Sequence, residues 1–347
     1  MDTAILRRLL EGHELSAVEA ESFMGTIMDG DLCAASLGAA LAALKFRGVT
    51  SAELGGFARA MRARCVPVEA SAASRAVDTC GTGGDGRDTF NISTAAALVT
   101  AAAGVPVAKH GNRAASSRCG SADVLEALGV TLTADAPALG RILDEVGIAF
   151  LFAPNHHPAM RHAMPTRRAL GVRTVFNLLG PLANPAGVRR QLLGVYAPRL
   201  CGLMAEALRD LGAERALVVH GRDGQDEFSL TGETMITELQ DGRLHHRSVR
   251  PEDLGLTRCR AEDLIGGDAR ENADLVLATL RGEPGPRTEA VLFNAAGALV
   301  AAGAASDLSE AVTMAREAVG DGRGAGLLER LVEASGDLGR QAAGGDA

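Results

Sequence analysis

A short glycine-rich stretch, residues 78–94, constrains the fold of this chain more than any other feature of its sequence. It reads DTCGTGGDGRDTFNIST, follows a short apolar segment at 75–77, and leads into the alanine-rich run 95–103, which favours a helix. Glycine permits positive φ angles and lets a ligand approach the main-chain amides. Inward-turned amides bind anions, and the N-terminus of a following helix adds partial positive charge. This order predicts a phosphate site, with Asn91 or Ser93 capping the helix.

A second unit of the same kind follows at residues 105–129. Its apolar strand passes into a polar loop that carries the cations Lys109, Arg113 and Arg118, and Ser121 is expected to cap the next helix. A single glycine loop between a strand and a helix is often only a turn. Two neighbouring loops, one neutral and one cationic, instead predict a binding site for phosphate groups.

Beyond residue 76, short apolar segments alternate with amphipathic ones, and this alternation predicts an α/β fold with a mainly parallel central sheet. We expect strands at 76–79, 105–109, 148–153, 191–196 and 215–220, and helices at about 94–103, 121–128, 135–146 and 198–211. A hairpin at 227–239 and helices near 269–281, 287–302, 308–319 and 325–335 are expected to follow. Ligands bind such sheets at the carboxyl ends of the strands, where both loops lie.

Residues 1–65 show helical periodicity without a strand pattern, so we expect a small all-helical N-terminal subdomain. Two segments, 16–19 and 50–53, have the Ser/Thr-x-x-Glu pattern of a capping box. Residues 66–74 read as a linker. The predicted domains are 1–70 and 71–347, with a disordered, Gly- and Ala-rich tail from about residue 337.

The composition excludes several classes of function. The 347 residues carry 35 Lys and Arg against 43 Asp and Glu, a net charge of −8, which argues against general binding of nucleic acid. No uncharged apolar run reaches the roughly 18 residues needed to span a membrane. The six cysteines have no metal-type spacing, and without a signal peptide they predict free thiols in the cytoplasm.

An acidic pair, Asp226 and Glu227, follows the strand candidate 215–220. Because Mg²⁺ prefers a few carboxylate oxygens together with substrate phosphate and water, a pair on the same rim as the phosphate loops suits a metal–phosphate ligand. Neighbouring residues in a regular strand point to opposite faces. We therefore expect the pair in a loop after Gly224, across a cleft from Ser93.

The two loops together resemble the anthranilate phosphoribosyltransferase family. The similarity continues through HPAM at 157–160, RR at 167–168, FNLLGPLANP at 176–185 and DE at 226–227. The resemblance implies a fold like that of the nucleoside phosphorylases and phosphoribosyltransferases, in which part of 165–190 packs with the N-terminal helices. It implies transfer of the phosphoribosyl group of phosphoribosyl pyrophosphate (PRPP) to the amine of anthranilate in tryptophan biosynthesis. It also implies Mg²⁺ and a homodimer formed through the helical subdomain.

The resemblance also implies which residues bind each ligand. The PRPP contacts would be Gly81, Gly84, Asp85, Thr89, Asn91, Ile92, Ser93, Thr94, Lys109, His110, Gly111, Asn112, Arg113, Ala114, Ala115, Ser116, Ser117 and Ser121. Anthranilate would contact Gly81, Asn112 and Arg167, whose guanidinium matches a carboxylate in two hydrogen bonds. Metal ligands would be Ser93, Asp226 and Glu227. His156 and His157 are candidates for lining the anthranilate entrance. We assign no general base, because the aromatic amine is neutral at pH 7.

Two alternatives stay open at this point. A pyrimidine nucleoside phosphorylase shares the architecture and the glycine loop, but it does not explain the acidic pair or Arg167. A catalytically silent relative that binds nucleic acid is disfavoured by the net negative charge.

Overall fold

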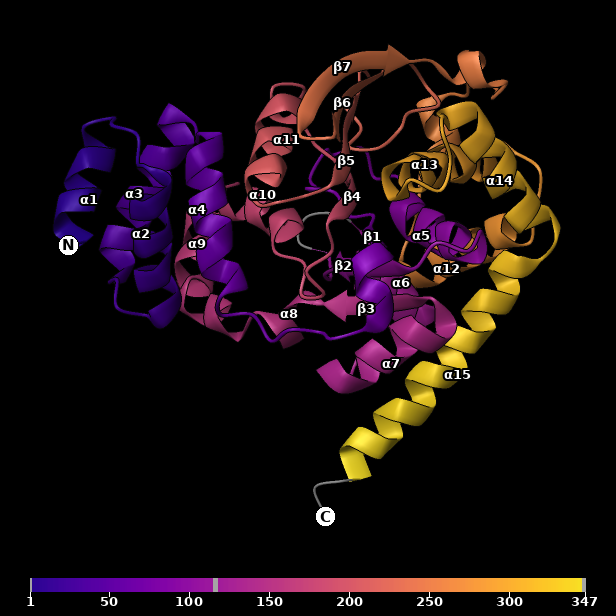
Figure 1. Cartoon of the computed structure of the whole chain (residues 1–347), viewed down its shortest axis with the longest axis horizontal. Coiled ribbons are helices and arrows are strands. Elements are labelled where there is room, and N and C mark those ends of the chain that lie inside the picture. Colours follow the sequence, from indigo (N-terminus) through magenta and orange to yellow (C-terminus); the bar gives the residue numbers. More distant parts are fainter. Residues whose placement is uncertain (1, 115–117, 345–347) are drawn as a thin grey trace.

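A single sheet with the strand order β3-β2-β1-β4-β5-β6-β7 organises the computed structural model, which describes residues 2–114 and 118–344 (Figure 1). The first five strands in this order are parallel to one another, and β6 and β7 are antiparallel. Their bounds are β1 Val77–Asp78, β2 Val107–Gly111, β3 Ile148–Phe152, β4 Arg190–Gly194, β5 Arg215–Gly221, β6 Thr234–Gln240 and β7 Arg243–Val249. The predicted mainly parallel α/β sheet is confirmed.

The predicted strands at 76–220 each overlap one of β1 to β5, but the predicted hairpin at 227–239 is wrong. The hairpin is β6 and β7, and its turn is Asp241-Gly242, where both residues have positive φ. Asp-Gly is the stronger hairpin signal because such turns need left-handed backbone at both positions. Phe228 and Leu230, which fall in the predicted hairpin, are buried in a loop.

Four helices at the N-terminus lie beside the sheet and share a core with one of its faces (Figure 1). They are α1 Asp2–Leu10, α2 Ala17–Asp29, α3 Ala34–Arg47 and α4 Ser51–Arg62. α3 packs against α9 (Met164–Leu170), and α4 packs against α10 (Phe176–Leu179) and α11 (Leu200–Asp210). Thus the segment 164–179, from the middle of the chain, packs with the N-terminal helices, as the sequence resemblance implies.

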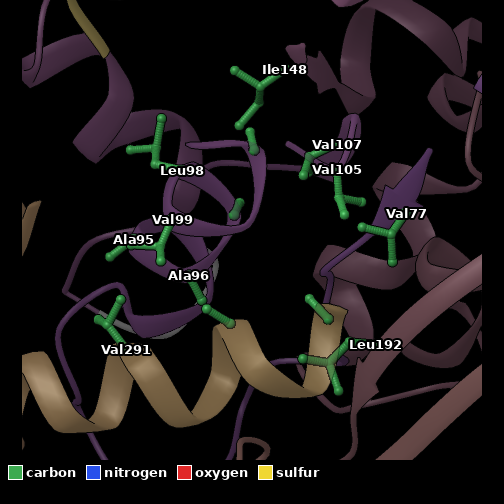
Figure 2. Close-up of a cluster of buried hydrophobic side chains, with 14 of the residues drawn as sticks. Val77, Ala95, Ala96, Leu98, Val99, Val105, Val107, Ile148, Leu192 and Val291 are labelled. Atoms are coloured by element: carbon green, nitrogen blue, oxygen red, sulfur yellow. The ribbon is translucent and has the colours of Figure 1, made fainter. Parts of the chain in front are cut away.

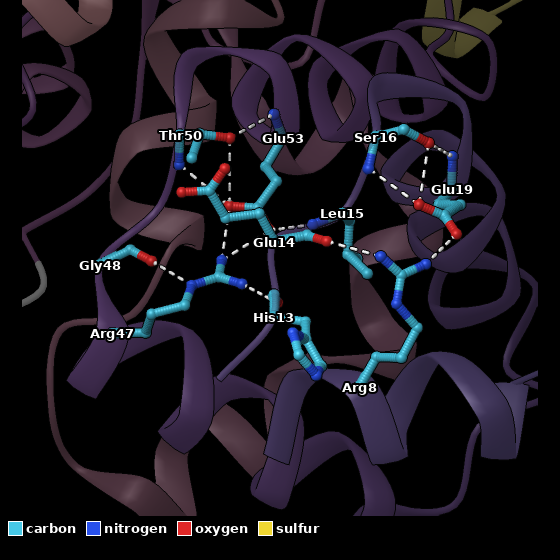
Figure 3. A network of polar contacts seen from close by, with 10 residues as sticks. All are labelled: Arg8, His13, Glu14, Leu15, Ser16, Glu19, Arg47, Gly48, Thr50 and Glu53. Atoms are coloured by element: carbon cyan, nitrogen blue, oxygen red, sulfur yellow. Dashed lines mark hydrogen bonds and ion pairs between the residues drawn. The ribbon is translucent and has the colours of Figure 1, made fainter. Parts of the chain in front are cut away.

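Glu53 anchors the loops between these helices (Figure 3). Both of its carboxylate oxygens accept from Arg47 Nη2 at 2.6 Å, and one also accepts from the main chain of Leu15 at 2.9 Å. The predicted capping boxes Ser16–Glu19 and Thr50–Glu53 are both present. Glu53 is fully buried, so the residue that completes this helix cap also forms a buried ion pair with Arg47 inside the subdomain.

Buried, mostly aliphatic side chains of the surrounding helices pack against the other face of the sheet. Val77, Val107 and Ile148 of the strands lie near Leu98 and Val99 of α5 (Ile92–Ala102) in Figure 2. The remaining helices that surround the sheet are α6 Ser121–Ala127, α7 Ala136–Val146, α8 Ala153–His156, α12 Ala269–Leu280, α13 Pro286–Ala302, α14 Leu308–Gly320 and α15 Arg323–Gly344. In the described part of the chain, none of the helices has both the length and the apolar character to cross a bilayer.

The sequence predicted a disordered tail from about residue 337, whereas α15 extends to Gly344; residues 345–347 lie outside the described residues. Leu327, Leu328 and Leu331 of this helix are buried against the α/β core, so the helix is nucleated by packing.

Candidate active site

The glycine-rich loop between β1 and α5 has a left-handed backbone at three of its four glycines. Gly83, Gly84 and Gly86 have φ values of 66°, 76° and 75°. The loop is fixed to the end of β4, because Thr82 N donates to Gly194 O at 2.9 Å and Thr82 Oγ1 accepts from Tyr196 N at 3.1 Å. Residues with side chains rarely adopt this backbone, which turns main-chain amides toward one region at the carboxyl end of the sheet.

The N-terminus of α5 is not capped by a side chain, which corrects the expectation for Asn91 and Ser93. Asn91 is the N-cap residue, but its side chain makes no cap hydrogen bond, and Ser93 lies within the first turn. The Asn91 amide instead donates to Cys119 O at 3.3 Å. The first main-chain N–H groups of α5 are therefore not engaged by a side-chain cap, and the helix dipole favours an anion there.

Lys109, a predicted PRPP contact, lies buried between the start of the glycine loop and the first turn of α5. Its ammonium donates to Thr79 O at 2.8 Å and contacts Ser93 Oγ at 3.4 Å. Burial lowers the pKa of Lys109, and the buried Asp78 carboxylate beneath it raises that pKa in part. Lys109 thus holds the start of the glycine loop and Ser93 together.

Two residues of the cationic loop, Arg113 and Ser121, are not placed as the sequence predicted. Arg113 pairs with Asp123 at 3.1 Å and with Glu126, so its guanidinium is already held by α6. Ser121 is the first residue of α6 and not its cap, which is Gly120; its hydroxyl donates to Asn112 O at 3.2 Å. Ala115, Ser116 and Ser117 lie outside the described residues.

The acidic pair lies directly on the glycine loop. Asp226 Oδ2 accepts from Gly83 N at 2.7 Å, and the main chain of Ser93 lowers the pKa of the Glu227 carboxyl in part. The predicted loop placement is confirmed, and Asp226 bonds directly to the glycine loop at Gly83. A Cβ atom on Gly194 would lie 1.6 Å from Asp226 O, so β4 must end in glycine for the pair to reach this position.

The environment of the pair suits a divalent cation. Burial, and then the neighbouring carboxylates, raise the pKa of Asp226 to about 7 and that of Glu227 to about 8. Asp85 contributes to both shifts. Excess buried negative charge is costly unless a cation neutralises it. Within residues 2–114 and 118–344 no three His, Cys, Asp or Glu side chains form a metal-ligand group, so substrate and water would complete the shell of any Mg²⁺.

Arg167 of α9 is a half-buried cation whose guanidinium lies 5.0 Å from the centre of the Phe176 ring. Burial lowers its pKa, and it has no ion-pair partner among the residues that the structure describes. α10 leads from Phe176 to Gly180, whose carbonyl contacts His110 at the end of β2 at 3.1 Å. Phe176 and Gly180 thus link Arg167 to His110, at the edge of the sheet that carries the cationic loop.

Three buried histidines lie close to this rim. The rings of His110 and His157 are 5.1 Å apart, and His156 Nδ1 contacts Val66 O at 2.9 Å. Burial lowers the pKa of His110 to about 3 and that of His157 to about 4, so both are neutral at pH 7. Because Gly180 O only accepts, His110 carries its proton on Nδ1; its buried Nε2 has no partner in the described part of the chain.

Sequence reasoning missed Arg173 at this site. Its guanidinium lies 4.5 Å from the centre of the Tyr196 ring and so close to Gly84 that a Cβ there would meet its Nε at 3.3 Å. It also lowers the pKa of Asp226, although burial and Asp85 outweigh it. No local pattern around Arg173 signals these contacts, because its partners come from distant segments.

Comparisons with known proteins agree with this architecture. Residues 3–65 match the model of the glycosyl transferase family helical bundle domain, and 73–325 match that of the glycosyl transferase family a/b domain. The chain is 48% identical to an anthranilate phosphoribosyltransferase of Desulfatibacillum aliphaticivorans, covering 96% of this chain and 98% of the relative. It is 53% identical to that of Anaeromyxobacter sp. (strain Fw109-5), covering 94% and 96%.

Two solved structures are similar along nearly the whole chain. The anthranilate phosphoribosyltransferase from Thermus thermophilus matches with a TM-score of 0.91 and 47% identity, covering 96% of this chain and 99% of that one. The Saccharomyces cerevisiae enzyme in complex with PRPP and Mg matches with a TM-score of 0.89 and 25% identity, covering 97% and 98%.

Proposed function

The chain belongs to the anthranilate phosphoribosyltransferase family, and on this premise we propose that it transfers the phosphoribosyl group of PRPP to the amine of anthranilate, releasing pyrophosphate, in tryptophan biosynthesis. One observation carries the proposal: the Gly83 amide already binds an anionic oxygen, Asp226 Oδ2, beside the N-terminus of α5. A pyrophosphate oxygen is a ligand of the same kind.

The reaction breaks the bond between the anomeric carbon and pyrophosphate and forms one to the amine. The amides of the glycine loop and the N-terminus of α5 stabilise negative charge as it develops on the departing pyrophosphate. Ser93, Asp226 and Glu227 would hold Mg²⁺, which supplies further positive charge to the phosphate oxygens. The neutral His110 Nε2 is an acceptor that suits an amine N–H without removing its proton.

The remaining site residues keep the roles that the sequence suggests, as part of this proposal. PRPP binds to Ser121, to the loop 109–117 and, in the glycine loop, to Gly81, Gly84, Asp85, Thr89 and 91–94. Lys109 acts from beneath the glycine loop, and Arg113 exchanges its carboxylate partners for a phosphate oxygen. Arg167, Asn112 and Gly81 bind anthranilate. Two observations support these roles. The Lys109 ammonium, at the start of the cationic loop, contacts Ser93 Oγ at the end of the glycine loop, and the Arg167 guanidinium is half-buried against the Phe176 ring.

An anthranilate fluorescence assay tests the proposed function. Anthranilate fluorescence should fall with time only when PRPP and Mg²⁺ are both present, and omission of either should stop the reaction. Phosphorolysis of a pyrimidine nucleoside by the same preparation, without anthranilate consumption, would instead support the phosphorylase alternative.

Replacing Arg167 by Ala should raise the KM for anthranilate about 10- to 100-fold, since a charge-assisted hydrogen bond contributes roughly 1.5–3 kcal/mol. The KM for PRPP should stay close to that of the parent. Arg168→Ala is the matched control, because Arg168 is the next residue on α9 and is less buried. An unchanged anthranilate KM in Arg167→Ala would remove Arg167 from the binding site.

The proposal includes a homodimer formed by the helical subdomain. Leu10 and Phe46, at the ends of α1 and α3, are 60% and 92% exposed and line a hollow of about 390 Å³. An exposed apolar patch of this kind on a helical surface suits a second copy of the same surface.

The division into a helical domain up to about residue 70 and an α/β domain after it is supported by the two family models.

Phe46→Asp should convert the dimer to a monomer at micromolar concentration, measured by light scattering, because it places a charge in the apolar contact. Val18→Asp is the control: Val18 is 77% exposed on α2 but does not line the hollow. A parent protein that is already monomeric would refute the dimer.

The free thiols of the described cysteines support our proposal that the enzyme acts in the reducing cytoplasm.

A further inference from the structure

A short segment before α12 touches both phosphate loops. Gly266 N donates to Asp88 O at 2.9 Å in the glycine loop, and Phe90 N donates to Leu264 O at 3.0 Å. On the other side, Arg118 Nη1 of the cationic loop donates to Gly266 O at 3.2 Å. Residues 264–267 therefore lie between the ends of the two loops.

Asn272 extends this bridge through its side chain. It lies in the first turn of α12 and is 1% exposed. Its Oδ1 accepts from Gly267 N at 2.7 Å, and its Nδ2 donates to Asn91 Oδ1 at 2.8 Å. The Asn91 amide in turn donates to Cys119 O at 3.3 Å.

The two ends of this chain of hydrogen bonds fix its direction. Gly267 N–H only donates and Cys119 C=O only accepts, so the oxygen and nitrogen positions of both amides follow without ambiguity. The two links to Gly267 and Asn91 depend on Asn272 having an acceptor on one side and a donor on the other. The chain joins the glycine loop, through Asn91, to the last residues of the cationic loop.

Packing around the amide leaves no room for an alternative arrangement. A Cβ atom on Gly266 would lie 2.6 Å from Asn272 Oδ1 and 2.7 Å from Phe90 Cα. Asp268 and Glu271 form a capping box that fixes the start of α12, and α12 packs against α5 and α6, the helices that follow the two loops. Asn272 is thus held on a fixed helix start while its amide holds Asn91 in place.

We propose that Asn272 is a positioning residue for PRPP, setting the spacing of the two phosphate loops through Asn91. The proposal rests on the proposed function, since PRPP is the ligand that both loops would bind at once. Asn272 itself is buried behind Asn91 and acts through it. Neither the glycine pattern nor the cationic loop in the sequence points to this residue, which lies 181 positions from Asn91.

Asn272→Ala should raise the KM for PRPP, and its calorimetric Kd in Mg²⁺, on the order of tenfold, because two buried hydrogen bonds are lost and their partners stay unpaired. The KM for anthranilate at saturating PRPP should rise less than the KM for PRPP, since Arg167, on α9, lies outside this chain of hydrogen bonds. Thr279→Val is the matched control: Thr279 is also on α12, is 1% exposed, and bonds only to its own helix at Leu275 O and Val276 O. It should leave both constants unchanged.

A double-mutant cycle with Asn91→Ala separates positioning from general destabilisation. If Asn272 acts through Asn91, the double variant should bind PRPP no more weakly than Asn91→Ala alone. Additive losses, or equal rises in both KM values in Asn272→Ala, would overturn the proposal. Asn272→Asp tests the same link in a variant of the same shape, because its carboxylate still accepts from Gly267 N but cannot donate to Asn91; a PRPP affinity equal to the parent's would also overturn it.

The parent enzyme distinguishes this proposal from the proposed function. If the parent consumes anthranilate with PRPP and the variants match it, only the role of Asn272 is wrong. If the parent neither binds PRPP nor consumes anthranilate, the proposed function itself fails.

Discussion

The double variant Asp226→Ala, Glu227→Gln is expected to lose turnover by about 10²- to 10³-fold, since a bound metal contributes several kcal/mol of charge stabilisation. Asp226 lies against the Gly83 amide of the glycine loop, where the pyrophosphate of PRPP would bind, and Glu227 is the next residue. Without a metal they would repel that group. Magnesium activation should therefore shift to higher concentration, measured by titrating Mg²⁺ at fixed PRPP in the anthranilate assay.

The fold of this variant should stay intact. Burial of two carboxylates beside Asp85 is unfavourable in the metal-free protein, so their removal should not lower the unfolding temperature. Asp241→Asn is the matched control, because it removes an exposed carboxylate from the β6–β7 turn and Asn tolerates its positive φ. Parental activity and an unchanged magnesium profile in the double variant would refute the metal role of the pair.

Glu53→Ala is expected to lower the free energy of unfolding by about 3–5 kcal/mol, the usual cost of removing one partner from a buried ion pair. Arg47, whose side chain is 17% exposed, would lose its carboxylate, and the main-chain N–H groups of Leu15 and Thr50 would lose their acceptor. Urea unfolding monitored by circular dichroism measures the change.

Arg8→Ala provides the comparison within the same subdomain. Its pair with Glu19 is partly exposed, with side-chain exposures of 41% and 36%, so its removal should lower the free energy of unfolding far less than Glu53→Ala does. Equal losses in the two variants would show that burial does not distinguish the two pairs and would refute the anchoring role of Glu53.

Local patterns in the sequence predicted much of this fold. The capping boxes at Ser16 and Thr50 formed because their partners lie three residues away, within one turn of helix. The strands overlap their predicted positions because a buried parallel strand needs a continuous apolar run. The glycine loop was recognisable because positive φ angles favour glycine, whatever the rest of the chain does.

The expectations that failed were those in which a local signal competed with packing. Asn91 has the chemistry of a helix cap, but Asn272 and Cys119 O, from other segments, take up its side chain. Phe228 and Leu230 look like strand residues, but the buried Asn294 of α13 binds the main chain of Phe228 and holds this segment as a loop. A side chain with several partners of similar energy adopts the one that the tertiary structure brings near.

The sequence alone therefore determined the elements, the glycine loop and the family, because each depends on residues close together in the chain or on a shared pattern of them. Only the tertiary structure decided what surrounds the site. Asp226 reaches Gly83 across 143 positions, Lys109 lies beneath Thr79, and Arg173 lies against Gly84. Such contacts follow from the order and register of parallel strands, which bring distant loops to one rim, and no spacing within a single segment encodes them.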